Sequence, residues 1–132
     1  MQKINYKKLL LKKKIEPISC LTAYSKPLAN ILDGNVDLIL VGDSLGTTLY
    51  GMKNTRHVNL EMMKNHGRAV VRNTKKSMTI IDMPYKTYRN KKEALKNALD
   101  ILSYTKAEFI KIETDNKNID TVSYTHLTLP TN

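Results

Sequence analysis

Asp43, Asp82 and Glu113 each lie at the carboxyl end of a short, mostly apolar segment. If these segments are neighbouring parallel strands, their carboxyl ends meet at one edge of a sheet, where parallel α/β enzymes bind their ligands. Carboxylates that converge there repel one another unless a cation lies between them, and hard oxygen ligands favour Mg²⁺. Lys111 comes two residues before Glu113, on the same face of an extended chain, and is suited to an anionic substrate group. The pattern predicts a site for Mg²⁺ or a similar ion, with an anion site beside it.

The competing explanation for these carboxylates is structural. A single acidic residue after a strand often only closes a turn or caps the next helix. Three in successive segments, one of them with a lysine on the same face, favour a site. Alternation along an extended segment also places Asp43 on the face of Val41 and Asp82 on the face of Ile80. Gly42 fits either explanation, because glycine permits a tight turn or a close approach to a ligand.

Ser44 belongs to the tetrad GDSL (42–45), which is the signature of a family of serine esterases. A serine nucleophile needs a general base, and these esterases carry theirs in a late Asp-x-x-His pair. The residues three positions before the three histidines are Asn54, Met63 and Ser123, so that pair is absent. A nucleotide-binding P-loop is excluded as well, since no lysine follows the second glycine of GDSLGTT. Asp43, not a nucleophilic serine, is therefore the main candidate in the tetrad.

The elements that would position these residues alternate along the chain. Short apolar segments typical of parallel strands covered on both faces occupy 17–24, 36–42, 78–83 and 108–113. Helices are expected near the amino terminus and at 26–34, 60–76 and 91–107. Asn59 and Asn90 are suited to cap the last two, with Glu93 completing a capping box. The expected apolar stripe of the last helix, which should pack on the sheet, is Leu95, Ala98, Leu99 and Leu102.

A run of βα units requires a parallel sheet, either an open doubly wound sheet or a barrel. An open dinucleotide-binding sheet would need a glycine-rich turn after its first strand, and LTAYSKP contains no glycine. Four strands in little more than a hundred residues correspond to about half of a (β/α)₈ barrel of roughly 250 residues. The fold class predicted is therefore α/β, as the first four βα units of a (β/α)₈ (TIM) barrel.

The net charge of +10 first suggests an anionic macromolecule as partner. The lysines, however, lie in short runs along the chain and form no arginine-rich stripe with aromatic residues between them. A solvated surface is the preferred interpretation, with no nucleic-acid partner, and a functional basic patch is the alternative. No apolar stretch approaches the roughly 18 residues of a membrane span, so no membrane partner is expected either. The single cysteine, Cys20, suits a reducing, cytoplasmic location and is expected to be buried as a small hydrophobe.

Six stretches resemble the ketopantoate hydroxymethyltransferase family in order and spacing. They are CLTAYSKPLANILD, VDLILVGDSLGTTLYG, VNLEMMKNHGRAV, IIDMPYKTY, EALKNAL and IKIE, within about residues 3–114. The resemblance implies a (β/α)₈ barrel, Mg²⁺, homo-oligomers, and transfer of a hydroxymethyl group from 5,10-methylenetetrahydrofolate to 3-methyl-2-oxobutanoate, giving 2-dehydropantoate in pantothenate synthesis. Carried over by position, it implies that Asp43 and Asp82 ligate the metal directly and contact the substrate, that Glu113 completes the metal site, and that Ser44 and Lys111 bind the substrate.

The chain also departs from the family pattern. Lys53 and His57 stand where the family more often has acidic and proline residues, and 114–116 replace its glycines. The family's proton-abstracting glutamate, a substrate-contacting histidine and four further strands come after the stretch that matches. We therefore expect residues 1–121 to be the amino-terminal half of a barrel, inactive and unstable alone because its edge is uncovered. Residues 122–132 are expected to be a non-native tail, since their threonine-rich sequence does not continue the pattern.

Two alternatives remain open at this point. Another Mg²⁺-dependent barrel acting on 2-oxo acids, of the phosphoenolpyruvate mutase and isocitrate lyase type, would share the acidic edge but not this spacing of motifs. A basic nucleic-acid-binding module would be retained on heparin and released by moderate salt, without any effect of Mg²⁺ on stability.

Overall fold

The computed structural model describes residues 3–113. Its strands are β1 Cys20–Thr22, β2 Leu38–Val41, β3 Met78–Asp82 and β4 Phe109–Lys111. Its helices are α1 Tyr6–Lys12, α2 Lys26–Leu32, α3 Leu45–Leu49, the 3₁₀ turn η1 Thr55–His57, α4 Leu60–Val71 and α5 Lys91–Thr105. None of the helices in this part of the chain combines the length and hydropathy needed to cross a bilayer.

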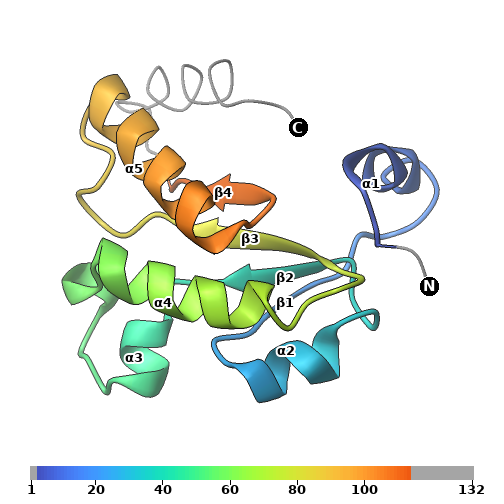
Figure 1. The fold of residues 1–132 in the computed structure, drawn as a ribbon, viewed down its shortest axis with the longest axis horizontal. Helices are drawn as coiled ribbons and strands as arrows, with labels where there is room; N and C mark the ends of the chain where they lie inside the picture. The colour runs from blue at the N-terminus through green and yellow to red at the C-terminus, as the bar shows by residue number, and fades with distance from the viewer. Residues whose placement is uncertain (1–2, 114–132) are drawn as a thin grey trace.

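The four strands form one parallel sheet in the chain order β1-β2-β3-β4. Helical crossovers connect them, with α2 after β1, α4 after β2 and α5 after β3 (Figure 1). All four predicted strands are present, although each is shorter than predicted. The α/β fold class and its run of βα units are confirmed, and closure into an eight-stranded barrel stays a prediction.

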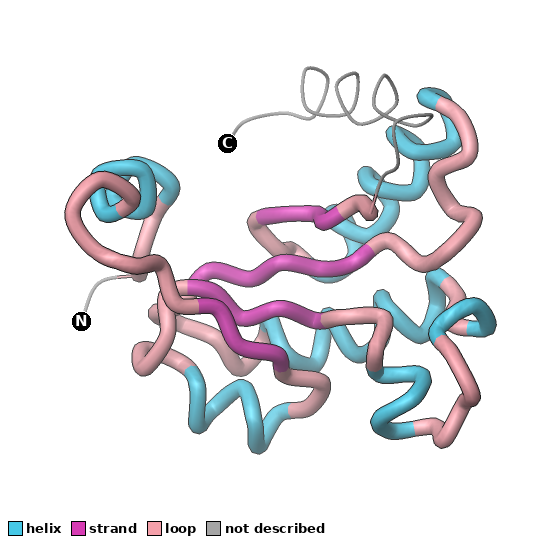
Figure 2. The backbone as a smooth tube through the Cα atoms, turned by 180° about the vertical axis from the view of Figure 1, so that it is seen from behind, coloured by secondary structure: helices cyan, strands magenta, loops and turns pink. Residues whose placement is uncertain are grey.

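The two faces of the sheet differ in burial. Ile39, Val41 and Ile81 point to the helices and are fully buried. Leu40 and Ile80 point to the opposite face and are only partly buried. Viewed from behind, the strands lie in front of the helices, and no described helix covers this second face (Figure 2). Within residues 3–113 the helices therefore cover only one face of the sheet, whereas the sequence predicts strands that are covered on both faces.

Cys20 lies on this open side of the sheet and is exposed, so the prediction that it is buried is wrong. The apolar sequence around it is typical of a covered strand, but β1 is an edge strand here and all three of its residues are exposed. Although the residue as a whole is exposed, partial burial of its sulfur raises the pKa of the Cys20 thiol, and the nearby carboxylate of Asp82 adds to this. The thiol is therefore not activated as a nucleophile.

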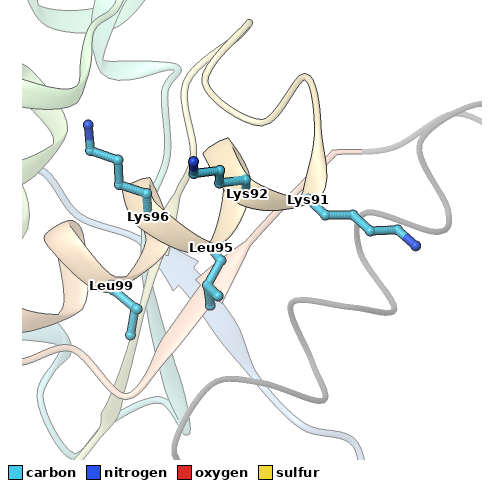
Figure 3. A pocket seen from close by; sticks show the side chains of 5 residues that line it. All are labelled: Lys91, Lys92, Leu95, Lys96 and Leu99. Atoms are coloured by element: carbon cyan, nitrogen blue, oxygen red, sulfur yellow. The ribbon is translucent and has the colours of Figure 1, made fainter.

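The predicted apolar stripe of α5 is correct at Ala98, which is buried, and wrong at Leu99, which is exposed; Leu95 and Leu102 are only partly buried. The residues of α5 that are buried are Ala94, Ala98, Ile101 and Thr105. Leu99 is 40% exposed and lines a surface hollow together with Leu95 and three lysines (Figure 3). Helix α5 packs against α4. At Gly67 of α4 a Cβ would lie 2.5 Å from Ile81 Cδ1 and 3.1 Å from Thr105 Cγ2, so this position has no room for a side chain.

The helix starts agree with their predicted caps. The side chain of Asn59 accepts a hydrogen bond from the Met62 N–H, and that of Asn90 accepts one from the Glu93 N–H. The capping box at Glu93 is wrong, because its carboxylate accepts from the N–H and guanidinium of Arg89, outside the helix.

Helix α4 ends five residues earlier than predicted, at Val71. The following residues turn toward the sheet instead, because the Asp33 carboxylate accepts hydrogen bonds from the N–H groups of Lys75, Lys76 and Ser77. A side chain from the end of α2 thus fixes where β3 begins. Helix α3 and η1 were not predicted, because each has too few residues to show a helical pattern of apolar positions in the sequence.

The predicted opening helix is present as α1, which lies beyond the amino ends of the strands (Figure 1). It is joined to the sheet through Asp37, which directly precedes β2 and is 5% exposed. The Lys12 ammonium donates to both Asp37 oxygens at 2.8 and 2.9 Å, and the Ser19 N–H and hydroxyl each donate at 2.8 Å. A buried carboxylate therefore holds α1, the entry to β1 and β2 together.

Candidate active site

Asp82, the last residue of β3, is the centre of the carboxyl edge of the sheet, and its side chain is 6% exposed. Its Oδ1 accepts a hydrogen bond from the Lys111 ammonium at 2.6 Å, and its Oδ2 accepts one from the Asp43 backbone N–H at 3.2 Å. The register pairs Asp82 with Lys111, so both side chains leave the same face of neighbouring strands. One buried carboxylate thus connects the ends of β2, β3 and β4.

Lys111 joins Asp82 to the third predicted carboxylate. Its ammonium donates to Glu113 Oε1 at 3.0 Å, and Glu113 itself is 71% exposed. Burial lowers the pKa of Lys111, but the hydrogen bonds and charges of the two carboxylates raise it by more, so the net pKa is above its ordinary value. The lysine is therefore a fixed positive charge at this edge, and the predicted common face of Lys111 and Glu113 is confirmed.

Asp43 also lies at this edge of the sheet, but its side chain is not directed by strand alternation as predicted. Val41, its expected neighbour on one face, points to the helices and is fully buried. Asp43 lies beyond the end of β2, in the turn before α3, so strand alternation no longer sets its direction. Burial raises the pKa of the Asp43 carboxyl, the Asp82 carboxylate raises it further, and a hydrogen bond from the Thr55 side chain opposes both.

Ser44 follows in the same turn and is the N-cap of α3. Its hydroxyl makes no capping bond to the helix; it lies 2.7 Å from the phenol oxygen of Tyr24. The structure therefore brings together all five predicted site residues, Asp43, Ser44, Asp82, Lys111 and Glu113, at one edge of the sheet. Within residues 3–113 the only hydrogen bond of the Ser44 side chain is the one to Tyr24.

Gly42 is needed for a close approach. A Cβ at this position would lie 2.8 Å from Ser44 Oγ and 3.4 Å from Asp82 Oδ2. The absence of a side chain lets the turn bring Ser44 and Asp82 against the end of β2.

Gly42→Ala is expected to lower the free energy of unfolding by about 1–2 kcal/mol, because the new methyl group displaces the Ser44 hydroxyl. The measurement is urea unfolding at pH 7, in the wild type and in a Ser44→Ala background. The cost should fall by half or more in that background, where the clashing oxygen is gone. An equal cost in both backgrounds would contradict the role assigned to Gly42.

The residues at this edge fit a divalent cation in their chemistry. Asp43 and Asp82 supply hard oxygen ligands. The pKa of Asp43 is raised first by burial and then by the nearby Asp82 carboxylate, and a cation would offset the repulsion between these two carboxylates. Within residues 3–113 no three acidic, histidine or cysteine side chains are arranged together as a metal site. The Lys111 ammonium donates hydrogen bonds to both Asp82 and Glu113, at 2.6 and 3.0 Å.

Three residues near this site were not predicted: Tyr24, Thr55 and Tyr88. Burial raises the pKa of the Tyr88 phenol, and the carboxylates of Glu113, Asp43 and Asp82 raise it further. Only Tyr24 had a usable signal, since it follows Thr22 by two residues and so continues the face of β1 that carries the site.

Comparison with known proteins decides the family. Residues 3–128 match the family model described as ketopantoate hydroxymethyltransferase. This chain belongs to that family. A 3-methyl-2-oxobutanoate hydroxymethyltransferase of Pelagibacter ubique is 50% identical over 111 residues, which are 84% of this chain and 43% of the relative. Its counterparts in Anaplasma marginale (strain St. Maries) and Rhodospirillum rubrum are 48% and 46% identical over 110 residues, 83% of this chain and 40% of theirs.

Membership of the ketopantoate hydroxymethyltransferase family confirms the resemblance and favours it over the two alternatives considered from the sequence. The chain spans about two fifths of the length of the curated relatives it matches. The predicted boundary between 121 and 122 lies outside the described residues, as do 114–116 and the expected tail, and it stays a prediction.

Proposed function

We propose that this chain supplies the metal-binding and 2-oxo-acid-binding part of an enzyme that transfers a hydroxymethyl group from 5,10-methylenetetrahydrofolate to 3-methyl-2-oxobutanoate, giving 2-dehydropantoate. The relatives are named for the oxo acid and for the group that they transfer. The observation that carries the proposal is the buried Asp82 carboxylate. One of its oxygens accepts a hydrogen bond from the Asp43 backbone N–H, and the other accepts one from the Lys111 ammonium.

In this proposal Asp43 and Asp82 hold Mg²⁺ and contact the oxo acid, and Glu113 completes the metal site. The ion would act as a Lewis acid on the keto and carboxylate oxygens, which makes the C3 proton of the oxo acid more acidic. Mg²⁺ as the ion, the homo-oligomeric state and the cytoplasmic location all remain predictions.

The chain's own donors would orient the oxo acid. Lys111 is held as a cation by its neighbours, so it can balance the substrate carboxylate. The Ser44 hydroxyl is free of any capping bond and can donate to the same group. These residues bind and orient, and we assign none of them the removal of the C3 proton.

The test is the free energy of unfolding with Mg²⁺ and 3-methyl-2-oxobutanoate present. Ligands at about 100 times their Kd should stabilise the folded chain by roughly 2.7 kcal/mol. Asp43→Asn and Asp82→Asn should abolish this gain. Asp100→Asn is the matched control, because Asp100 is a surface carboxylate on α5, paired with Lys64, and should leave the gain intact. A wild type that shows no gain, or a gain that survives Asp82→Asn, would contradict the proposal.

A further inference from the structure

Tyr24 lies two residues beyond β1, at the same edge of the sheet as the proposed site, and is 9% exposed. Its phenol oxygen is 2.7 Å from Ser44 Oγ, so the two hydroxyls share a hydrogen bond. We propose that Tyr24 is a positioning residue, which orients the Ser44 hydroxyl toward the carboxylate of the bound 2-oxo acid. This inference rests on the function proposed above and adds a residue that acts through Ser44.

The unusual behaviour of Ser44 at the start of α3 is the first support. An N-cap serine normally accepts a hydrogen bond from an N–H of the first helical turn. Ser44 does not, and its backbone is helical, with φ −54° and ψ −12°. Its carbonyl is tied into α3 by the Thr48 N–H and the Thr47 hydroxyl, each at 3.0 Å. The backbone of Ser44 is therefore fixed while its hydroxyl is directed away from the helix, toward Tyr24.

The second support is that Tyr24 is itself held from α4. His66 Nδ1 lies 2.7 Å from the Tyr24 carbonyl oxygen. A carbonyl can only accept, so Nδ1 carries the proton and donates it. His66 Nε2 is 3.0 Å from the Tyr50 hydroxyl, and in a neutral imidazole this nitrogen accepts. Tyr50 and His66 thus fix the backbone of Tyr24, and its phenol has a defined direction.

The chemistry of two hydroxyls gives this contact a consequence. A serine hydroxyl has one proton and two acceptor lone pairs. When Tyr24 donates its phenol proton to Ser44 Oγ, the Ser44 proton stays available for an anionic acceptor. Donation by one neighbour also strengthens the hydrogen bond that the hydroxyl makes to the next. Because Asp43 and Asp82 place negative charge at this edge, a substrate carboxylate depends on such aligned donors.

Tyr24→Phe removes the phenol oxygen and keeps the ring that packs in the core. At saturating Mg²⁺, the Kd for 3-methyl-2-oxobutanoate is expected to rise about 3–10-fold, because the substrate loses one aligned hydrogen bond. The Kd for Mg²⁺ alone should be unchanged. Tyr6→Phe on α1, beyond the opposite end of the strands, is the matched control and should alter neither constant.

A double-mutant cycle separates positioning from a merely structural role. Titration calorimetry on the full chain gives the oxo-acid Kd for the wild type, Tyr24→Phe, Ser44→Ala and the double variant. If Tyr24 acts through Ser44, its substitution should change the Kd less than about twofold once Ser44 is alanine. The same fold-change in both backgrounds would overturn the inference, and so would unfolding of Tyr24→Phe, since the phenol would then be structural.

The outcomes distinguish this inference from the function on which it rests. A wild type that binds no oxo acid in the presence of Mg²⁺ contradicts the proposed function. A wild type that binds it, with Tyr24→Phe binding equally well, overturns the positioning role alone.

Discussion

Asp37→Ala is expected to lower the free energy of unfolding by about 2–4 kcal/mol at pH 7, the largest loss we predict for one side chain. The substitution removes the acceptor of hydrogen bonds from the Lys12 ammonium and from the Ser19 N–H and hydroxyl. It therefore releases α1 and the entry to β1 together. Urea unfolding followed by circular dichroism measures the loss. Asp100→Ala, at the surface of α5, is the control and should cost less than about 0.5 kcal/mol.

The pH dependence of the same variant has a defined sign. Burial raises the pKa of Asp37, but Lys12 and Ser19 lower it by more, so the net pKa is below its ordinary value of 3.8. A depressed folded-state pKa supplies stability that is complete above pH 3.8 and is lost as the pH falls through the folded value. The gap between wild type and Asp37→Ala should therefore be constant near neutral pH and close in acid. A gap that widens in acid would contradict the assignment.

Lys111→Met is expected to affect the two proposed ligands in opposite directions. Without the ammonium, Asp82 and Glu113 lose their nearest positive charge, at 2.6 and 3.0 Å. Mg²⁺ should then bind more tightly, because it no longer competes with the Lys111 ammonium for the carboxylates. The gain should be limited to about tenfold, because Lys111 and Glu113 are partly exposed to solvent, which screens their charges. Binding of 3-methyl-2-oxobutanoate should weaken by at least a similar factor, since its carboxylate loses a charged donor.

Titration of the chain with Mg²⁺, and then with the oxo acid at saturating Mg²⁺, measures both effects. Lys64→Met is the matched control, because Lys64 pairs with Asp100 at 2.8 Å on the helical side of the molecule. It should change neither affinity. A Lys111→Met chain in which both ligands bind more weakly would mean that the lysine supports the fold of the edge, and that it does not compete with the metal.

The parts of the fold that were predictable are those set by local chemistry. Apolar segments became strands because a short apolar run is itself a local signal, and Asn59 and Asn90 cap their helices because a capping hydrogen bond joins residues three apart. The direction of α5 was not predictable from its period. Leu95 and Leu99 repeat as regularly as Ala94 and Ala98, and the sequence alone does not show that the smaller pair is the buried one.

The site divides in the same way. The common face of Lys111 and Glu113 follows from the period of an extended chain, and their meeting with Asp82 follows from parallel strands in sequential order. Asp43 was placed at the correct edge for the wrong reason, since a turn and not a strand directs it. The period of β1 would have placed Tyr24 at this edge, but its contact with Ser44 was not predictable, because a single pair of hydroxyls joins residues 20 apart in sequence.

The exposure of Cys20 gives the molecule a chemical reporter. The chain has one thiol, and it lies on the face of the sheet that the described helices leave open. A thiol-labelling reagent therefore reads the solvent access of that face at a single, known position, without any engineered cysteine. Whatever covers this face in a longer polypeptide or an assembly would slow labelling at Cys20. The rate of one reaction thus monitors the completion of the fold around the proposed site.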